Sequence, residues 1–374
     1  MTVGSPGQIG AGAVDPAVAL RTKACDLLGV RYPIVQTGMG WVAGVRLTAA
    51  TSAAGGLGIL ASATMSYEQL ERSLREVRER TSNPFGVNLR TDHPDVERFV
   101  ALMVREGVKV ASFAQAPSAA IVARLKDAGI VTMPTVAAPR HAEKVAALGV
   151  DAMIAQGHEG GGHTGPIPTS LLLPRVTALV DVPVLGAGGF HDGRGLVAAL
   201  AWGAAGVAMG TRFLLTKEST VPDEIKARYL TAALTDTVVT RAIDGAPQRV
   251  IRTDLVDRLE GRFGSAGAAT RAVANAFRLR RLTNTSLTGL VREGLAMKRN
   301  SDLSWAQVAM AANAPMLTRA SMVEGRLEAG ILPTGQVTGL IEALPTVAEL
   351  IDGIVSEAVS TLATLSRRVA VPDA

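Results

Sequence analysis

Eight short aliphatic runs recur along the chain at nearly regular intervals, and this rhythm constrains the fold more than any other feature. The runs start 20 to 31 residues apart, and Gly, Pro or polar residues bound each of them. They begin at Pro33, Gly56, Phe85, Val108, Val131, Asp151, Val182 and Gly206. Each run is too short for a globular helix, whereas buried parallel strands have this length and composition. The sequence therefore predicts eight such strands.

Helical patterns fill the intervals between these runs. Within Tyr67–Arg80, the apolar residues Leu70, Leu74 and Val77 fall on one helix face. Two more segments have similar patterning, residues 118–128 and 140–148. Eight strands that alternate with helices about every 25 residues predict an α/β fold, a closed (β/α)8 TIM barrel. A doubly wound open sheet is the alternative.

The rhythm stops near Ala233, and the predicted domain boundaries follow from this. Residues 1–22 are rich in Gly, Ala, Pro and Val without periodicity, so we expect a flexible N-terminal tail. Residues 23–235 and 325–374 are predicted to form the barrel and its C-terminal helices. Residues 236–324 are predicted to form an inserted, Arg-rich helical subdomain that lies over the barrel mouth.

Positive charge is concentrated in the inserted segment. The whole chain has a net charge of +5, but residues 241–300 alone carry an excess of +7. Such a segment suits an anionic ligand, and its few aromatic residues weigh against single-stranded nucleic acid. The alternative is a solvated helical face. The candidate phosphate-binding residues are Arg278, Arg280, Arg281, Lys298 and Arg299.

Composition indicates where such a protein would work. Apolar residues make up 48% of the chain and charged residues 19%, as in a soluble protein with a large core. No apolar run reaches the roughly 18 residues that a membrane span needs, and the N-terminus lacks a secretory signal pattern. A single cysteine, Cys25, cannot form an internal disulfide. We therefore expect a cytoplasmic protein in which Cys25 is a small buried apolar side chain.

Glycine-rich loops follow the last three predicted strands. The loop after the sixth strand, residues 156–165, contains five glycines. Glycines cost conformational entropy but let a flat ring system approach backbone amides; a merely flexible loop is the alternative. The seventh strand ends in GAGG (186–189) and the eighth in MGT (209–211). Backbone amides at these two strand ends commonly bind phosphate in barrels, so we expect a phosphorylated ligand.

His163 is the candidate for proton transfer, because an imidazole titrates near neutral pH and this one lies among glycines at the predicted mouth. Asn88 ends the third strand and Gln156 the sixth, where each amide can hydrogen-bond to the edge of a ring. His158 and His163 have no cysteine or paired carboxylate nearby in the sequence, so no zinc site is expected. Capping or surface roles are the simpler interpretation for three other histidines, His93, His141 and His191.

Six ordered motifs resemble the nitronate monooxygenase family of FMN-binding barrels, which also includes flavin-containing enoyl-ACP reductases. They are PIVQTGMG, AGGLGIL, PFGVNL, QGHEGGGHTG, GAGGF and MGTRF. The resemblance runs from about Leu27 to Ser219 and returns at residues 333–336. One departure is Gly160, where alanine is commoner in the family.

The resemblance implies that FMN is the cofactor and that His163, in the GGH motif, is a catalytic base. It implies that Gly38 and Met39 face the flavin and that residues 208–211 surround its phosphate. The expected cofactor-binding residues are Gly38, Met39, Asn88, Gln156, Gly161, Gly162, Gly188, Gly189, Ala208, Met209, Gly210 and Thr211.

Within the family, the stretch QTGMGWVAG, the loop GHEGGGH and the Arg-rich insertion resemble an actinobacterial branch associated with steroid-ring degradation. This implies an FMN-dependent oxidoreductase that acts on the Cα–Cβ bond of a bicyclic, steroid-derived acyl-CoA thioester. The basic segment fits a ligand with phosphates at one end and an apolar group at the other.

Two alternatives differ in function: a nitronate monooxygenase that uses O2, and a non-catalytic flavin or acyl-CoA binding protein. A small-molecule CoA thioester is the expected partner, and neither nucleic acid nor membrane is expected. A homodimer is a common assembly for such proteins.

Overall fold

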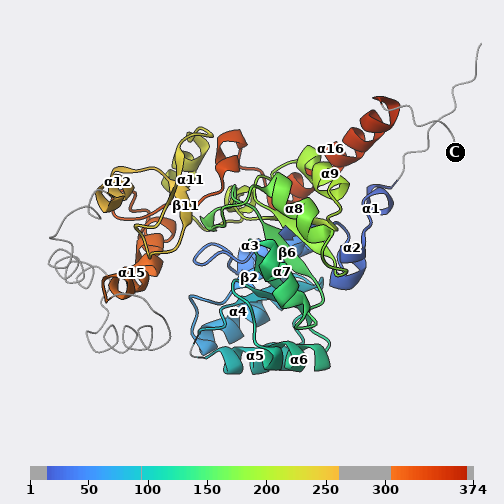
Figure 1. Ribbon diagram of the computed structural model, residues 1–374, viewed down its shortest axis with the longest axis horizontal. Coiled ribbons are helices and arrows are strands. Elements are labelled where there is room, and N and C mark those ends of the chain that lie inside the picture. Colours follow the sequence, from blue (N-terminus) through green and yellow to red (C-terminus); the bar gives the residue numbers. More distant parts are fainter. Residues whose placement is uncertain (1–14, 94, 261–304, 369–374) are drawn as a thin grey trace, which may run out of the picture.

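The computed structural model describes residues 15–93, 95–260 and 305–368 (Figure 1). Eight parallel strands close into a barrel in the order β1, β2, β3, β4, β5, β6, β8, β9, and β9 pairs back onto β1. They are β1 Ile34–Gln36, β2 Leu57–Ala61, β3 Phe85–Leu89, β4 Val110–Phe113, β5 Val131–Val136, β6 Met153–Gln156, β8 Val184–Ala187 and β9 Gly206–Met209. The predicted (β/α)8 barrel is confirmed, and the open-sheet alternative is wrong.

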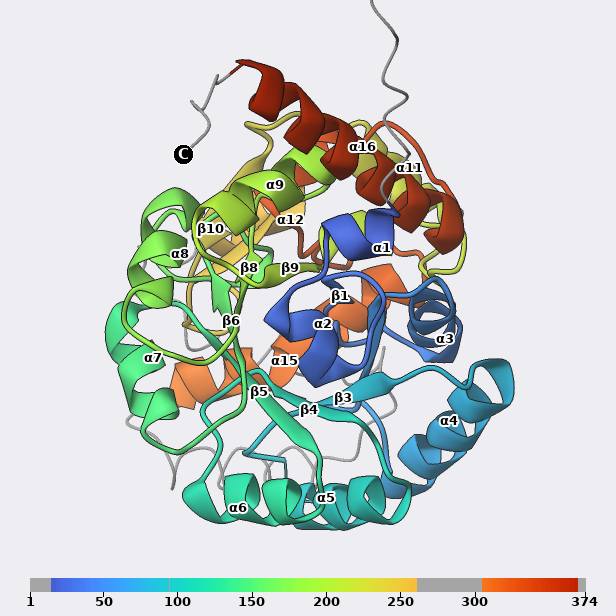
Figure 2. The same cartoon turned by 90° about the vertical axis from the view of Figure 1, so that its right-hand side faces the viewer.

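Helices alternate with these strands and surround the barrel (Figure 2). They are α3 Val45–Ala53, α4 Tyr67–Arg80, α5 Val96–Arg105, α6 Ala119–Asp127, α7 Pro139–Ala146, α8 Thr169–Thr177, α9 Gly193–Ala201 and α10 Thr211–Leu214. The helix predicted over residues 67–80 is confirmed. Ser66 and Gln69 form a capping box at its start, and its three inward apolar side chains are fully buried.

Helix α2, Lys23–Leu28, closes the end of the barrel at which the strands begin, and it lies across that end in Figure 2. Ala24 and Leu28 belong to one buried cluster with Val35 and Ile59 of the barrel strands. With this end filled by apolar side chains, the opposite end is left for ligands, as in other barrels of this type.

The predicted N-terminal tail extends too far, because residues 15–22 are part of the folded structure. Asp15 Oδ1 accepts a 2.9 Å hydrogen bond from Ala17 N at the start of α1, Pro16–Ala19. Leu20 is 1% exposed in the core. Cys25 is buried, as predicted. Leu20 is the one buried residue of this stretch, and no periodic pattern in the sequence reveals it.

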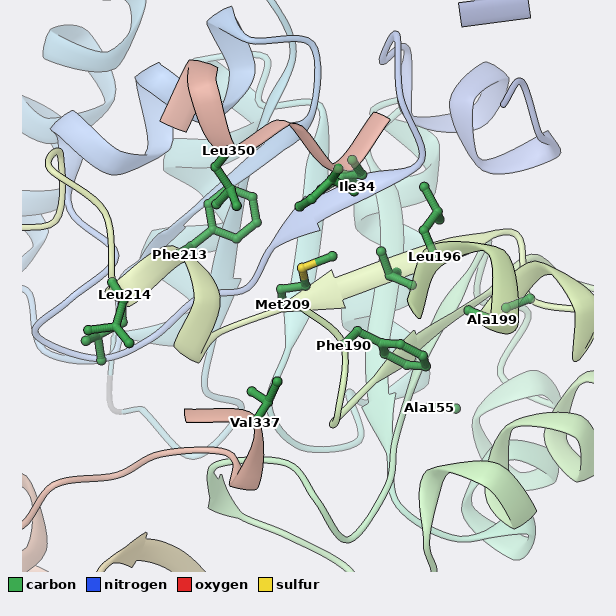
Figure 3. Close-up of a cluster of buried hydrophobic side chains, with 14 of the residues drawn as sticks. Ile34, Ala155, Phe190, Leu196, Ala199, Met209, Phe213, Leu214, Val337 and Leu350 are labelled. Atoms are coloured by element: carbon green, nitrogen blue, oxygen red, sulfur yellow. The ribbon is translucent and has the colours of Figure 1, made fainter. Parts of the chain in front are cut away.

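The largest apolar cluster of the described residues joins the barrel to several surrounding helices, among them the C-terminal helix α16, Val347–Arg368. Figure 3 shows Ile34, Met209, Phe213 and Leu350 converging there from β1, β9, α10 and α16. Close packing also depends on the first residue of α9, because a Cβ on Gly193 would lie 2.4 Å from Ile354 O in α16. Helix α16 thus packs back onto the barrel.

A small antiparallel sheet lies over the other end of the barrel, on the side away from α2 (Figure 1). Its order is β10 (Thr237–Thr240), β11 (Gln248–Ile251), β7 (Gly162–His163). The helices of this part are α11 Asp223–Leu230, α12 Asp254–Glu260, α15 Trp305–Met322 and the 3-10 helix η1 Gln336–Leu340. The segment predicted to be helical from residue 236 therefore begins with a β-hairpin. Its strands are only four residues long and pair with a distant loop, so local patterning does not distinguish them from helix.

Candidate active site

The loops after β1, β6, β8 and β9 meet at the carboxyl end of the barrel. Thr37 N, just after β1, donates a 3.1 Å hydrogen bond to Met209 O at the end of β9. Gly157 N, just after β6, donates one of 2.9 Å to Ala187 O at the end of β8. Since β7 lies outside the barrel, the predicted sixth, seventh and eighth strands are β6, β8 and β9. Their glycine-rich loops lie next to one another.

Hydrogen bonds hold the loop after β6 along its whole length. His158 N donates to Ile167 O at 2.8 Å, and the Thr164 hydroxyl donates to Gly157 O at 3.1 Å. The His158 ring is bonded through Nδ1 to Gly165 O at 2.8 Å. These hydrogen bonds link the loop to itself and to residues 165 and 167.

Glu159, which the sequence analysis does not single out, caps α8. Its carboxylate accepts hydrogen bonds of 2.9 Å from Thr169 N and 2.8 Å from Thr169 Oγ1. Its backbone oxygen accepts another of 2.9 Å from Gln336 N. The protein's own carboxylate thus occupies the start of α8.

Bare backbone is presented by the loops after β6 and β8. Gly188 and Gly189 have left-handed φ values of 92° and 86°, and Gly162 one of 65°. A Cβ on Gly188 would lie 2.9 Å from Gly160 N, so glycine is needed where the two loops touch. A Cβ on Gly189 would meet its nearest atom at 3.8 Å, and one on Gly162 would meet none within 4 Å. These two positions leave room for a flat group against the backbone.

Residues 333–336 close on the glycine-rich loop from far along the sequence. A Cβ on Gly161 would lie 2.4 Å from the carbonyl carbon of Thr334. Gly335 N donates a 2.8 Å hydrogen bond to Thr211 Oγ1, just after β9. The loop after β6 and the end of β9 are thus joined through this segment.

Two predicted side-chain amides lie at the ends of β3 and β6. Asn88 is buried, donates a 3.2 Å hydrogen bond to Ser112 Oγ, and packs against Gly38, where a Cβ would lie 2.3 Å from Asn88 Cβ. Gln156 Nε2 donates a 2.7 Å hydrogen bond to His163 O. Gln156 therefore fixes the backbone of the candidate base.

The predicted cofactor residues around the end of β9 are mostly buried, and their side chains pack inside the protein. Ala208 and Met209 are each 2% exposed, and Met209 lies in the cluster of Figure 3. A Cβ on Gly210 would lie 3.3 Å from Met39 Sδ.

Gln36 was not predicted as a site residue. It is fully buried, its Nε2 donates a hydrogen bond to Ile59 O in β2, and its Oε1 accepts one from Ile59 N. A polar residue that ends an apolar strand is the signal that could have found it.

The His163 ring is paired with a carboxylate from the β10–β11 hairpin. His163 Nε2 lies 2.8 Å from Asp244 Oδ2, and strand β7 pairs with β11 so that His163 is opposite Gln248. Burial raises the pKa of the Asp244 carboxyl, but hydrogen bonds from His163, Ala246 and Gln248 outweigh burial and lower it overall. The carboxylate is thus held as an anion beside the imidazole.

Arg249, next along β11, ties the hairpin to the glycine-rich loop. It is 4% exposed, its Nε and Nη2 donate to His158 O at 3.2 and 3.1 Å, and its Nη1 donates to Thr237 Oγ1 at 2.8 Å. Burial lowers the pKa of the guanidinium although Glu159 lies nearby. This residue, like Asp244, comes from outside the barrel and was not found by sequence reasoning.

Two other histidines, His93 and His191, lie next to the residues at the starts of helices α5 and α9. His191 does not cap α9; Asp192 does, and its Oδ1 accepts a 2.8 Å hydrogen bond from Gly195 N. His93 Nδ1 accepts a 3.1 Å hydrogen bond from Asp95 N, in agreement with the predicted local role. Burial lowers the pKa of both imidazoles. His93 lies after β3, whereas His191 lies on the loop between β8 and α9, next to the capping Asp192.

The predicted phosphate-binding residues, Arg278, Arg280, Arg281, Lys298 and Arg299, lie outside the described residues, so their role stays a prediction. Within the described part of the chain, no group of three or more His, Cys, Asp and Glu side chains is placed to hold a metal ion. Among the helices at residues 15–260 and 305–368, none is long and apolar enough to cross a membrane.

A closed barrel with glycine-rich loops and an exposed, carboxylate-paired histidine at the carboxyl ends of its strands has the architecture of a (β/α)8 barrel enzyme. The sequence profile of the family described as nitronate monooxygenase matches residues 21–357. The chain therefore belongs to the nitronate monooxygenase family, as its motifs indicated, and it is an oxidoreductase.

Two relatives and one solved structure match nearly the whole chain. A Rhodococcus jostii protein named (3aS,4S,5R,7aS)-5-hydroxy-7a-methyl-1-oxo-octahydro-1H-indene-4-carboxyl-CoA dehydrogenase is 55% identical over 92% of this chain and 98% of its own length. A Mycobacterium tuberculosis protein of the same name is also 55% identical, over 93% of this chain and 98% of its own. Among solved structures, FabK from Thermotoga maritima superposes with a TM-score of 0.78 at 34% identity, covering 93% of this chain and 99% of that one.

Proposed function

We propose that this chain is an FMN-dependent oxidoreductase that acts on the Cα–Cβ bond of a steroid-derived, bicyclic CoA thioester in the cytoplasm. The observation that carries this proposal is the 55% identity, over 92% of the chain, to a protein named as an indene-carboxyl-CoA dehydrogenase. The similarity extends across nearly the full length of both chains and thus includes the inserted segment as well as the barrel.

FMN fits the residues at the mouth of the barrel. Bare backbone at Gly162 and Gly189 leaves room for a planar ring, and the ends of β8 and β9 offer backbone amides to a phosphate. The amides of Asn88 and Gln156 would hydrogen-bond to the ring edge. When bound, FMN supplies a two-electron acceptor. These features support FMN as the cofactor, with the twelve predicted residues from Gly38 to Thr211 around it.

His163 supplies the proton acceptor in this proposal. The imidazole is 66% exposed, so a substrate can reach it, and its backbone is fixed by Gln156 and by strand pairing to β11. A thioester carbonyl acidifies the neighbouring Cα–H, so an imidazole can act as the base that removes that proton. In this proposal the loops at the carboxyl end of the barrel align the two reacting carbons.

The CoA end of the substrate is proposed to bind the basic segment of residues 241–300. Its excess of +7 charges matches the phosphates of CoA, and the five predicted arginine and lysine residues are the proposed contacts. A small nitroalkane would need no such segment, so the charge distribution favours the thioester over the nitronate.

Anaerobic spectroscopy tests the proposal. Purified yellow holoprotein is titrated with the hydroxy-methyl-oxo-octahydro-indene-carboxyl-CoA thioester, and loss of the flavin absorbance band is the expected result. Free CoA is the control, and it should leave the band unchanged. Persistent absorbance with every steroid-derived CoA thioester, in protein that dithionite does reduce, would contradict the proposal.

Nitronate oxidation is a second candidate, favoured by membership of the nitronate monooxygenase family. It predicts oxygen uptake when holoprotein is mixed with propionate 3-nitronate or an alkyl nitronate. Uptake that exceeds the rate of thioester turnover would make it the principal activity, and its absence removes this candidate. A non-catalytic binding protein would bind the thioester but give neither signal.

A further inference from the structure

We infer that Asp244 is a positioning residue that holds the His163 imidazole with Nδ1 free to accept a proton. The inference rests on the proposed role of His163 as base and adds a residue to it from outside the barrel. The contact is direct, since His163 Nε2 lies 2.8 Å from Asp244 Oδ2 across 81 residues of sequence.

The two partners differ strongly in exposure. The His163 side chain is 66% exposed, whereas the Asp244 side chain is 11% exposed. A buried carboxylate is costly unless hydrogen bonds satisfy it. Asp244 Oδ1 accepts one of 3.1 Å from Ala246 N, and Oδ2 accepts from the side chain of Gln248 as well as from the imidazole. The carboxylate is therefore a rigid anchor and the imidazole is the part open to substrate.

The backbone on both sides of the contact is also fixed. In the pairing of β7 with β11, His163 lies opposite Gln248, and Thr164 N donates a 3.1 Å hydrogen bond to Pro247 O. On the barrel side, Gln156 Nε2 donates to His163 O at 2.7 Å. The hairpin thus approaches the barrel in one register, and that register brings Asp244 to the imidazole.

The chemistry follows from which nitrogen carries the proton. An ionised carboxylate only accepts hydrogen bonds, so Nε2 carries the N–H of the neutral ring and Nδ1 keeps its lone pair. When the Cα–H bond of the substrate breaks, the proton goes to Nδ1 and the electron pair stays on carbon, delocalised into the thioester carbonyl. The resulting imidazolium is then paired with the Asp244 carboxylate.

A purely structural role for Asp244 makes a different prediction. Its bond to Ala246 N closes a tight turn in the hairpin, and Oδ1 alone accounts for that bond. Asparagine keeps this oxygen, so Asp244→Asn preserves the turn. However, the asparagine NH2 group can donate a hydrogen bond to Nε2 of His163. The neutral ring then carries its proton on Nδ1, so Nδ1 can no longer accept a proton from the substrate.

The kinetic test compares holoprotein of the wild type, Asp244→Asn and the control Asp26→Asn, which removes a half-exposed carboxylate of α2 paired with Arg21. We expect Asp244→Asn to lower kcat for the CoA thioester on the order of 10²–10⁴-fold, with KM and FMN content within about twofold. Asp26→Asn should match the wild type. A kcat for Asp244→Asn within about threefold of the wild type overturns the inference.

Nitrogen-15 NMR of histidine-labelled protein tests the tautomer without any turnover. The spectrum contains five histidines, and His163→Gln assigns the relevant one. In the neutral ring, the wild type should give an unprotonated Nδ1 and a protonated Nε2. A neutral ring that is protonated on Nδ1 overturns the inference even if Asp244→Asn is inactive. If no thioester is turned over by the wild type, the proposed function fails, while the tautomer result still decides the His163–Asp244 arrangement.

Discussion

Gly335 N donates a 2.8 Å hydrogen bond to Thr211 Oγ1, joining two segments 124 residues apart in the sequence. Thr211 begins α10 directly after β9, and Gly335 follows the long inserted segment. Both the acceptor hydroxyl and the donor amide are buried. The mouth of the barrel is therefore completed by the part of the chain that returns after the insertion.

Thr211→Val should destabilise this junction. Valine has nearly the same shape, but it leaves the Gly335 amide without its acceptor, and an unsatisfied buried donor costs about 1–3 kcal/mol. Urea unfolding followed by circular dichroism should show a lower midpoint with an unchanged slope. Thr211→Ser keeps the hydroxyl and is the matched control. Equal stability of the valine and serine variants would show that the hydrogen bond contributes nothing.

Gly161→Ala should disturb the cofactor site more than the rest of the fold. The added Cβ would lie 2.4 Å from the Thr334 carbonyl carbon and 2.5 Å from Gly335 N, both of them backbone atoms. Overpacking of this kind costs about 1–3 kcal/mol, and the strain falls on the loop that faces the proposed FMN. We expect at least a tenfold loss of FMN affinity, measured by flavin fluorescence on dilution. Gly353→Ala in α16, where a Cβ meets no atom within 4 Å, should bind FMN like the wild type.

The barrel could be predicted from the sequence because its signals are local. Each strand is a short aliphatic run, and the helix at residues 67–80 is fixed by three apolar residues at helical spacing and a capping box at Ser66. The glycine-rich loops are equally local, since glycine is required where Gly188 touches the backbone of Gly160.

The parts that the sequence did not reveal depend on long-range contacts. Asp244 is one of several acidic residues in the inserted segment, and only the register of β11 against β7 brings it to His163. Glu159 likewise becomes a helix cap only because Thr169 lies within hydrogen-bonding distance of it in the folded loop. Neither residue has a neighbour in the sequence that indicates its partner.

His163→Gln should remove proton transfer while leaving the cofactor bound. The side chain is 66% exposed, so its replacement creates no cavity, and its backbone position is set by Gln156 and β11 rather than by the ring. Loss of a general base lowers the rate on the order of 10²–10⁴-fold. Anaerobic stopped-flow measurement of flavin reduction by the thioester checks this. His141→Gln on α7 is the control, and comparable rates in both variants would exclude His163 as the base.

The stability contributed by the Asp244 carboxylate should disappear in acid. Burial alone would raise the pKa of Asp244, but its hydrogen bonds, the one from His163 foremost, bring it below the ordinary value of 3.8. A lowered pKa in the folded state means that ionised Asp244 favours folding. The stability contributed by the carboxylate is therefore complete above pH 3.8 and is lost as the pH falls through the lower folded pKa.

His163 is the titratable side chain bonded to Asp244, while the Arg249 guanidinium on β11 is bonded to His158 O. The difference in unfolding free energy between the wild type and Asp244→Asn should hold from pH 7 to about 5 and shrink below about 4. Urea titrations at several pH values measure it, with the half-exposed Asp257→Asn as the control. A difference that grows below pH 4 would mean that the folded protein favours the protonated carboxyl, which contradicts the pairing.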